Sequence, residues 1–257
     1  MTAPALLTLY CSVIAAGAVA GALVPVYAAQ GTRLVTFLSF AAGVMFGAAF
    51  FHMVPEAFHG GGYRVFPLLP VGFICLFLLE RYVLVHACEE PPDCAEHGHG
   101  KALGLTAFLG LSVHTLFDGV ALGSGVAEGV GFTAFVAIAA HKVPSSLSLA
   151  AILKTEGRRS AAVVGYGLAY GLMVPVGVAL YYLLSTLFPF EAFAPRALAF
   201  SAGTFLYIAV SDLLPRMNRH GRQGRLGNVA ALIGGLAVMF GLSLVTGHEH
   251  AGVVISP

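Results

Sequence analysis

Two consecutive apolar stretches decide the fold of this chain. Residues 102–126 read ALGLTAFLGLSVHTLFDGVALGSGV, and residues 130–153 read VGFTAFVAIAAHKVPSSLSLAAIL. A helix needs about 20 residues to cross the hydrocarbon core of a bilayer, and each stretch is long enough. Because only a short turn near Glu128 separates them, the two helices are predicted to form an antiparallel hairpin.

This hairpin is predicted to bring three ionisable residues to one depth in the membrane. His114 and Asp118 are four residues apart, so a helix presents both on the same face. His141 is as far from the turn in sequence as His114, so the two imidazoles are expected to meet. An ionisable side chain in hydrocarbon costs at least about 2.5 kcal/mol, so three of them together need a common explanation.

A metal ion supplies that explanation. Two neutral imidazoles and a carboxylate suit Zn²⁺ or another late first-row divalent ion. Ser145, one turn beyond His141, and Met45, in an earlier apolar stretch, are further candidate ligands. The alternative is a polar network that only joins the helices to one another.

The rest of the chain has the composition of a membrane protein. Hydrophobic residues make up 58% and charged residues 10%, whereas soluble domains carry about 25% charged residues. The net charge of +1 argues against a nucleic-acid partner. Eight apolar stretches are predicted to span the bilayer: residues 6–28, 34–58, 65–85, 102–126, 130–153, 161–187, 192–214 and 229–245. The predicted fold is thus an all-α membrane protein, with residues 1–257 forming one transmembrane domain.

The distribution of Lys and Arg predicts the orientation of these spans. The connections after the odd-numbered spans hold Arg33, Lys101, Lys154, Arg158, Arg159, Arg216, Arg219, Arg222 and Arg225. Those after the even-numbered spans hold only Arg64 and Arg196. Because cytoplasmic connections are enriched in positive charge, both termini are expected outside and segment 86–101 in the cytoplasm.

The second and seventh predicted spans share a pattern at one offset of 160 residues. The matching pairs are Gly43 with Gly203, His52 with Asp212, and Pro55 with Pro215. Since these two spans run in opposite directions, the pattern predicts an inverted-topology repeat, with three spans on each side of the central hairpin in a 3+2+3 arrangement. His52 would then lie toward the outer opening and Asp212 toward the inner one. Chance similarity is the alternative, because Gly and Pro are common in membrane helices.

Three motifs together resemble those of the ZIP (Zrt/Irt-like) family of divalent-metal transporters. They are His52, Pro55 and Glu56 (His-x-x-Pro-Glu), His114, Asp118 and Gly119 (His-x-x-x-acid-Gly), and His141, Lys142 and Pro144 (His-Lys-x-Pro). The last motif looks like the branch of the family in which His-Lys replaces a more acidic pair. The resemblance covers essentially the whole chain and implies a transporter.

Departures from the family pattern imply one metal site where better-known relatives have two. Thr115, Lys142, Ser145 and Val174 stand where that pattern places further metal ligands. We expect Lys142 to occupy the second-metal position and to pair with Asp118 when no metal is bound. The alternative is that Lys142 extends toward a water-filled cavity and plays no part in transport.

The segment 86–101 is rich in residues that bind zinc. It holds His86, Cys88, Cys94, His97 and His99, together with acidic residues. It is interpreted as a flexible cytoplasmic metal acceptor or sensor, with a disordered linker as the alternative.

The sequence as a whole predicts metal uptake by alternating access. The ion would pass His52 and Glu56, bind at the central cluster, and leave toward Asp212 and the histidines of segment 86–101. Zn²⁺ is the first expectation, and Fe²⁺, Mn²⁺, Co²⁺ and Cd²⁺ suit the same ligands. A multi-pass protein of the plasma or inner membrane is expected, with a homodimer as the candidate assembly and with no enzymatic activity and no cofactor. The competing functions are an intramembrane zinc hydrolase, although no His-Glu-x-x-His motif is present, and an exporter of the cation-diffusion kind.

Overall fold

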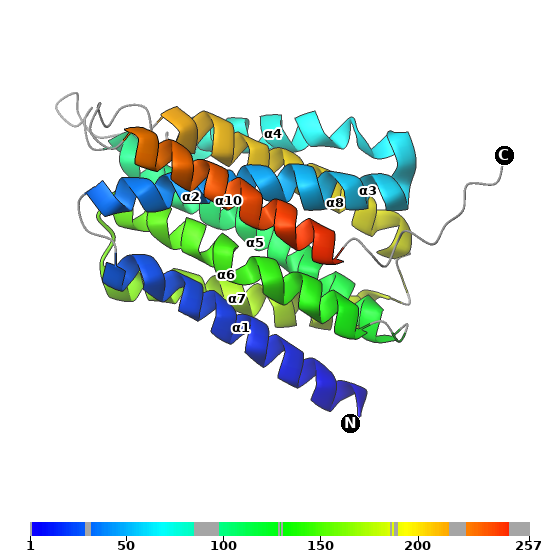
Figure 1. Ribbon diagram of the computed structural model, residues 1–257. Coiled ribbons are helices and arrows are strands. Elements are labelled where there is room, and N and C mark those ends of the chain that lie inside the picture. Colours follow the sequence, from blue (N-terminus) through cyan, green and yellow to red (C-terminus); the bar gives the residue numbers. More distant parts are fainter. Residues whose placement is uncertain are drawn as a thin grey trace.

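The computed structural model describes residues 2–28, 32–84, 98–127, 129, 131–185, 187, 190–215 and 225–246. Regular secondary structure in these ranges is helical throughout, and the helices lie side by side in one bundle (Figure 1). The α-helices are α1 (Ala3–Ala28), α2 (Thr32–Ala48), α3 (Val54–Gly61), α4 (Leu68–Leu78), α5 (Gly98–Ala127), α6 (Gly131–Thr155), α7 (Ser160–Leu184), α8 (Phe190–Tyr207) and α10 (Arg225–Thr246). Shorter segments are the 3₁₀ turn η2 (Gly62–Val65) and the π-helical segments η1 (Ala49–Met53), η3 (Leu79–Leu84) and η6 (Ile208–Leu213).

Six helical runs among the described residues are long and apolar enough to cross a membrane. They are Ala3–Tyr27, Arg33–Val65, Gly104–Ala127, Ala134–Thr155, Ser160–Leu184 and Leu226–Leu244. The predicted spans 65–85 and 192–214 are not among the six. A turn at Phe66 and Pro67 shortens the continuous helix in the first of these. The all-helical prediction is confirmed, while the count of eight spans and the outward position of both termini stay predictions.

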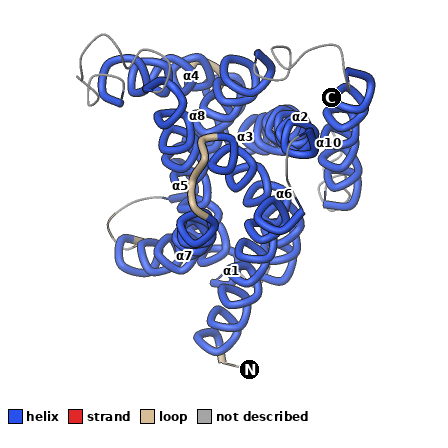
Figure 2. Tube along the Cα trace, turned by 90° about the vertical axis from the view of Figure 1, so that its left-hand side faces the viewer, coloured by secondary structure: helices blue, strands red, loops and turns tan. Residues whose placement is uncertain are grey.

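Glycine allows the closest helix contacts in the bundle. Seen end-on, α2 lies beside α10 and α4 beside α8 (Figure 2). A Cβ atom on Gly43 of α2 would collide with the carbonyl oxygen of Leu232 in α10. A Cβ atom on Gly203 of α8 would likewise collide with the carbonyl oxygen of Leu69, just inside α4. Both pairs of helices therefore approach to backbone contact, which small residues permit in membrane bundles.

Two π-helical segments precede proline residues in the same way. The N–H of Val54 donates to the carbonyl of Ala49, and the N–H of Leu214 donates to the carbonyl of Ala209. The next residue in each case is a proline, which has no N–H to donate to the preceding turn. A hydrogen bond between residues five apart, instead of four, thus widens the helix just before each proline.

The centre of the bundle is formed by α5 and α6, which pack against each other. Gly129, with φ of 86°, lies in the short turn between them. This left-handed conformation favours glycine, which has no Cβ atom to clash. In Figure 1, α1 begins and α10 ends at the same end of the bundle.

Replacing Gly43 with Ala is expected to separate α2 from α10 and to destabilise the bundle. The added methyl group meets backbone, which cannot move away by changing rotamer, so we expect a loss of about 1–3 kcal/mol. Thermal unfolding in detergent, followed by circular dichroism, measures the change. Gly241→Ala is the matched control on α10, since a Cβ there meets nothing within 4 Å. Equal midpoints for the two variants would contradict this account of the contact.

Candidate metal site

The three residues singled out by the sequence lie together in the middle of the bundle. His114 and Asp118 of α5 and His141 of α6 each offer a ligand atom, and these atoms all lie within 4.8 Å of one another. All three side chains are buried. The ring of Phe205 in α8 packs edge-on against the His114 ring, with centroids 4.9 Å apart. The hairpin geometry expected from the equal distances to the turn is therefore what the structure shows for these side chains.

The carboxylate of Asp118 lies between the two imidazoles, with one on each oxygen. His114 Nε2 is 3.5 Å from Asp118 Oδ1, and His141 Nε2 is 3.3 Å from Asp118 Oδ2. His141 Nδ1 is 2.8 Å from the carbonyl oxygen of Ala137. A carbonyl oxygen only accepts, so Nδ1 carries the hydrogen, and in the neutral ring Nε2 presents a lone pair to the carboxylate. Two such acceptors facing each other require a proton or a cation between them. A backbone carbonyl that orients a histidine in this way is typical of metal-binding histidines.

Lys142 lies near the same carboxylate oxygen of Asp118 as His141 and is completely buried. Its Nζ donates a hydrogen bond of 2.6 Å to Thr115 Oγ1 and lies 3.5 Å from Asp118 Oδ2. It also lies 4.2 Å from the centroid of the Tyr170 ring, an arrangement in which the aromatic face attracts the cation. The side chain has no exposed surface, so it does not extend toward solvent in this structure.

The weaker ligand candidates lie outside the cluster of three. Ser145 is buried one turn after His141, and its hydroxyl donates to the carbonyl of His141 at 2.8 Å. Only its lone pairs remain for a metal. Met45 is buried in α2 as part of the main hydrophobic core.

Helix α7 approaches α5 closely at the cluster. A Cβ atom on Gly119 would collide with the carbonyl oxygen of Val174, and Val174 itself is fully buried. At this position α7 thus offers an apolar side chain, and it contributes Tyr170 to the surroundings of Lys142.

The predicted outer residues lie one turn apart. His52 is half-buried in η1, and its ring centroid is 5.3 Å from that of His141. Glu56 is exposed in the first turn of α3. His52 is therefore a direct neighbour of the central cluster, closer to it than its predicted place at an opening implied.

The predicted inner residues are largely outside what the structure describes. Asp212 lies in η6, but its side chain is outside the described set, as is that of His99 in the first turn of α5. His86 and His97 lie outside the described residues, and so do Cys88 and Cys94. Because α5 begins at Gly98, the last residues of the predicted loop 86–101 are helical.

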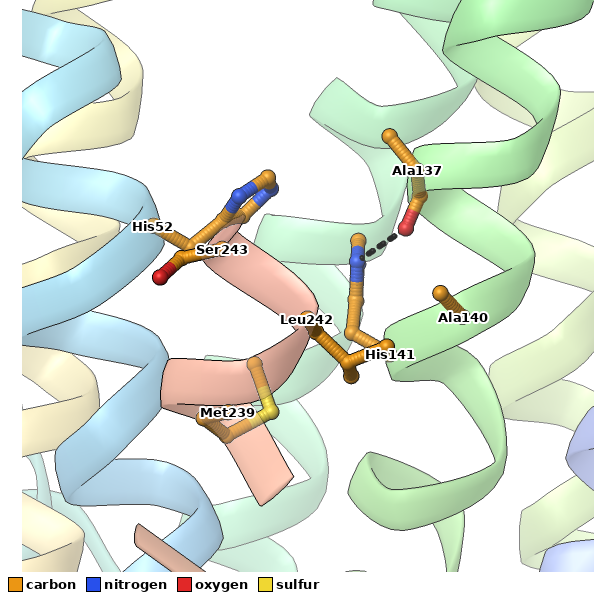
Figure 3. Close-up of a pocket in the computed structure, with 7 residues that line it drawn as sticks. All are labelled: His52, Ala137, Ala140, His141, Met239, Leu242 and Ser243. Atoms are coloured by element: carbon orange, nitrogen blue, oxygen red, sulfur yellow. Dashed lines mark hydrogen bonds between the residues drawn. The ribbon is translucent and has the colours of Figure 1, made fainter. Parts of the chain in front are cut away.

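A small cavity beside the cluster was not predicted from the sequence. It has a volume of about 10 Å³, and His52 and His141 line it together with Met239 and Ser243 of α10 (Figure 3). Little in the sequence singles out Met239 and Ser243, because α10 contains only apolar and small polar residues after Asn228.

Comparisons with known proteins assign the chain to a family. The sequence model of a family described as ZIP Zinc transporter matches residues 86–243. The chain belongs to this family. With the six apolar helical runs, this makes it an integral, multi-pass membrane protein. The predicted family resemblance is confirmed, and membership of the His-Lys branch stays a prediction.

Individual relatives carry the same family name. The chain is 31% identical over 201 residues to the Xenopus tropicalis protein named zinc transporter ZIP9, a match that covers 71% of this chain and 65% of that protein. Zinc transporter ZIP9 of Micropogonias undulatus is 32% identical over 203 residues, covering 71% and 64%. Zinc transporter ZIP1 of Takifugu rubripes is 29% identical over 255 residues, covering 80% and 83%. The chain thus spans slightly less than two thirds of the length of these two ZIP9 relatives.

Replacing Asp118 with Asn is expected to destabilise the metal-free protein through Lys142. The substitution keeps the shape of the side chain but leaves a buried cation without its counter-charge, at a cost of about 3–5 kcal/mol. Lys142→Met in the same chain is expected to restore most of the loss. Unfolding midpoints of both single variants and of the double variant, measured with excess chelator, form a double-mutant cycle. Additive losses in the cycle would mean that the two charges do not interact.

Proposed function

We propose that this chain carries a divalent transition-metal ion across the membrane through a single site made of His114, Asp118 and His141, with Zn²⁺ as the preferred substrate. The observation that carries the proposal is the facing pair of acceptors, His141 Nε2 and Asp118 Oδ2, 3.3 Å apart and buried. A divalent cation between them would be coordinated by both acceptors at once. The three relatives described above are named zinc transporters, which supports the same substrate.

The ligand set suits transit better than permanent storage. Structural zinc sites are usually closed by four protein ligands, whereas three ligands leave a coordination position open. An open position lets an ion exchange one ligand at a time as it arrives and leaves. Imidazole and carboxylate also bind Fe²⁺, Mn²⁺, Co²⁺ and Cd²⁺, so these ions are expected to compete with Zn²⁺.

Lys142 limits the site to one ion. Its Nζ sits beside the carboxylate that a second ion would need to share, held by Thr115 and the face of Tyr170. Metal binding at Asp118 competes with this ammonium group for the same oxygen. Lys142 thereby replaces the charge of a second metal ion.

The movement we propose is alternating access of two inverted repeats. The backbone contact at Gly43 between α2 and α10 has a counterpart at Gly203 between α8 and α4, and these glycines are paired at the offset of 160 residues. This parallel supports a 3+2+3 arrangement of eight spans.

The π-helical segments support the same repeat. The hydrogen bond from Val54 to Ala49 and that from Leu214 to Ala209 are also 160 residues apart. Widened turns before Pro55 and Pro215 are places where a helix can bend, and π-helical turns often occur at functional sites. The two elements thus supply matching hinges on opposite sides of the central hairpin.

We propose uptake as the direction of transport. With both termini outside, the ion passes Glu56 and His52 first, binds at the cluster, and leaves toward Asp212 and the histidines at 86, 97 and 99. The membrane is the plasma or inner membrane, and a homodimer is compatible with this pathway. A zinc hydrolase would need a general base at the metal, and Glu56, the sequence-based stand-in, is exposed on α3. A cation-diffusion exporter would move metal in the opposite direction.

Zinc flux into proteoliposomes tests the proposal directly. The purified chain is reconstituted with a zinc-sensitive dye inside the vesicles, and Asp118→Ala is expected to reduce inward flux at least tenfold because it removes the only carboxylate of the cluster. His59→Ala, an exposed histidine on α3, is the matched control and is expected to keep wild-type flux. Turnover of a lipid or peptide without flux would support the hydrolase instead, and outward flux alone would support the exporter.

Lys142→Met is expected to strengthen metal binding. Without the ammonium group, a divalent ion no longer competes with a cation 3.5 Å from Asp118 Oδ2. We expect the Kd for Zn²⁺ to fall at least tenfold, which corresponds to about 1.4 kcal/mol. Titration calorimetry in detergent measures it, with the wild type and Met53→Leu as references. An unchanged Kd would show that Lys142 does not compete with the metal ion for Asp118.

A further inference from the structure

The cavity beside the central cluster has room for one small species. Its volume of about 10 Å³ is close to the smallest cavity that holds one water molecule, about 10–15 Å³. Three of its lining side chains carry atoms that bind transition metals: the rings of His52 and His141 and the thioether of Met239. They come from three different elements, η1, α6 and α10, that converge there (Figure 3).

Helix packing fixes the position of Met239 relative to His52. A Cβ atom on Gly47 of α2 would lie 2.8 Å from the Cβ of Met239, so the absence of a side chain at Gly47 brings α10 close to this part of α2. In the next turn, the rings of Phe51 and Phe240 meet edge-on, with centroids 5.3 Å apart. The same contact between helices therefore holds both Met239 and the segment that carries His52.

His141 borders both the cavity and the central cluster. Its ring centroid is 5.3 Å from that of His52 and 5.6 Å from that of His114. Only Nε2 is available as a ligand, since Nδ1 donates to Ala137. Because the ring borders both positions, its rotation would carry the free nitrogen from one to the other. Asp118 does not line the cavity, so an ion there would be held by neutral ligands alone.

We propose that His52, His141 and Met239 form a staging site for one borderline or soft divalent ion, such as Zn²⁺ or Cd²⁺. The ion then passes to His114 and Asp118 through His141, the ligand that both positions share. The inference rests on the proposed transport function and adds a contribution from α10 to it. A thioether ligand favours soft ions, so Met239 gives the site a preference for Cd²⁺ and Zn²⁺ over Mn²⁺.

The transport test separates Cd²⁺ from Mn²⁺. Met239→Leu keeps the volume and apolar character of the side chain while removing its sulfur, so the helix contact should survive. We expect it to raise the KM for Cd²⁺ flux about tenfold and to leave the KM for Mn²⁺ within twofold. Met53→Leu, at a methionine that is equally buried but does not line the cavity, is expected to change neither.

A binding test works without any transport. In a chain whose four cysteines are replaced by serine, Met239→Cys places a single thiol at the cavity. Cd²⁺ is expected to slow its reaction with a small methanethiosulfonate reagent at least tenfold, and His52→Ala in the same chain is expected to abolish this protection. A wild-type KM for Cd²⁺ in Met239→Leu, or a thiol that Cd²⁺ leaves unprotected, overturns the staging site while zinc flux through the central cluster stands. Absence of zinc flux in the wild type overturns the proposed function instead. The protection test then still reports whether the cavity binds Cd²⁺.

Discussion

The structure depends on one carboxylate, that of Asp118, which three partners share in a buried space. One imidazole lies near Oδ1, and the other imidazole and an ammonium group lie near Oδ2, at 3.3 to 3.5 Å. A lone carboxylate in hydrocarbon would be too costly to keep ionised. Its partners make the charge tolerable, and because they come from α5 and α6, they also fix how these two helices pack. Helix α7 comes close to the same part of α5 through Gly119 and Val174, and its Tyr170 packs on Lys142.

The cluster could be predicted because its geometry is encoded by sequence distance alone. Spacing of four residues puts His114 and Asp118 on one helix face, and equal distance from a short turn puts His141 at the same depth. Only helix periodicity and a tight connection are needed for this. The resemblance to a known family predicted a transporter, and the family itself is now established by the match over residues 86–243.

Other features depend on contacts between distant segments, and these were not predictable from spacing. The sequence left two interpretations for Lys142, and only the packing of Thr115 and Tyr170 around it shows that the ammonium is enclosed. Met239 belongs to a helix that has no ionisable residues after Asn228, so no sequence motif marks it. It lies near His52 because Gly47 has no side chain and lets α10 approach α2. The widened turns before Pro55 and Pro215 had a sequence signal, the proline itself, but proline can also end or kink a helix.

The pairing of Lys142 with Asp118 also has an electrical consequence. One negative and one positive charge cancel, so Asp118 and Lys142 as a pair bring no net charge into the membrane field. A divalent ion bound there adds two charges that no remaining group balances, since the histidines are neutral ligands. Moving a charge across the membrane is worth about 2.3 kcal/mol per 100 mV. The bound ion would therefore respond to voltage while the Lys142–Asp118 pair alone would not, and a cytoplasm that is electrically negative would favour inward movement of the ion.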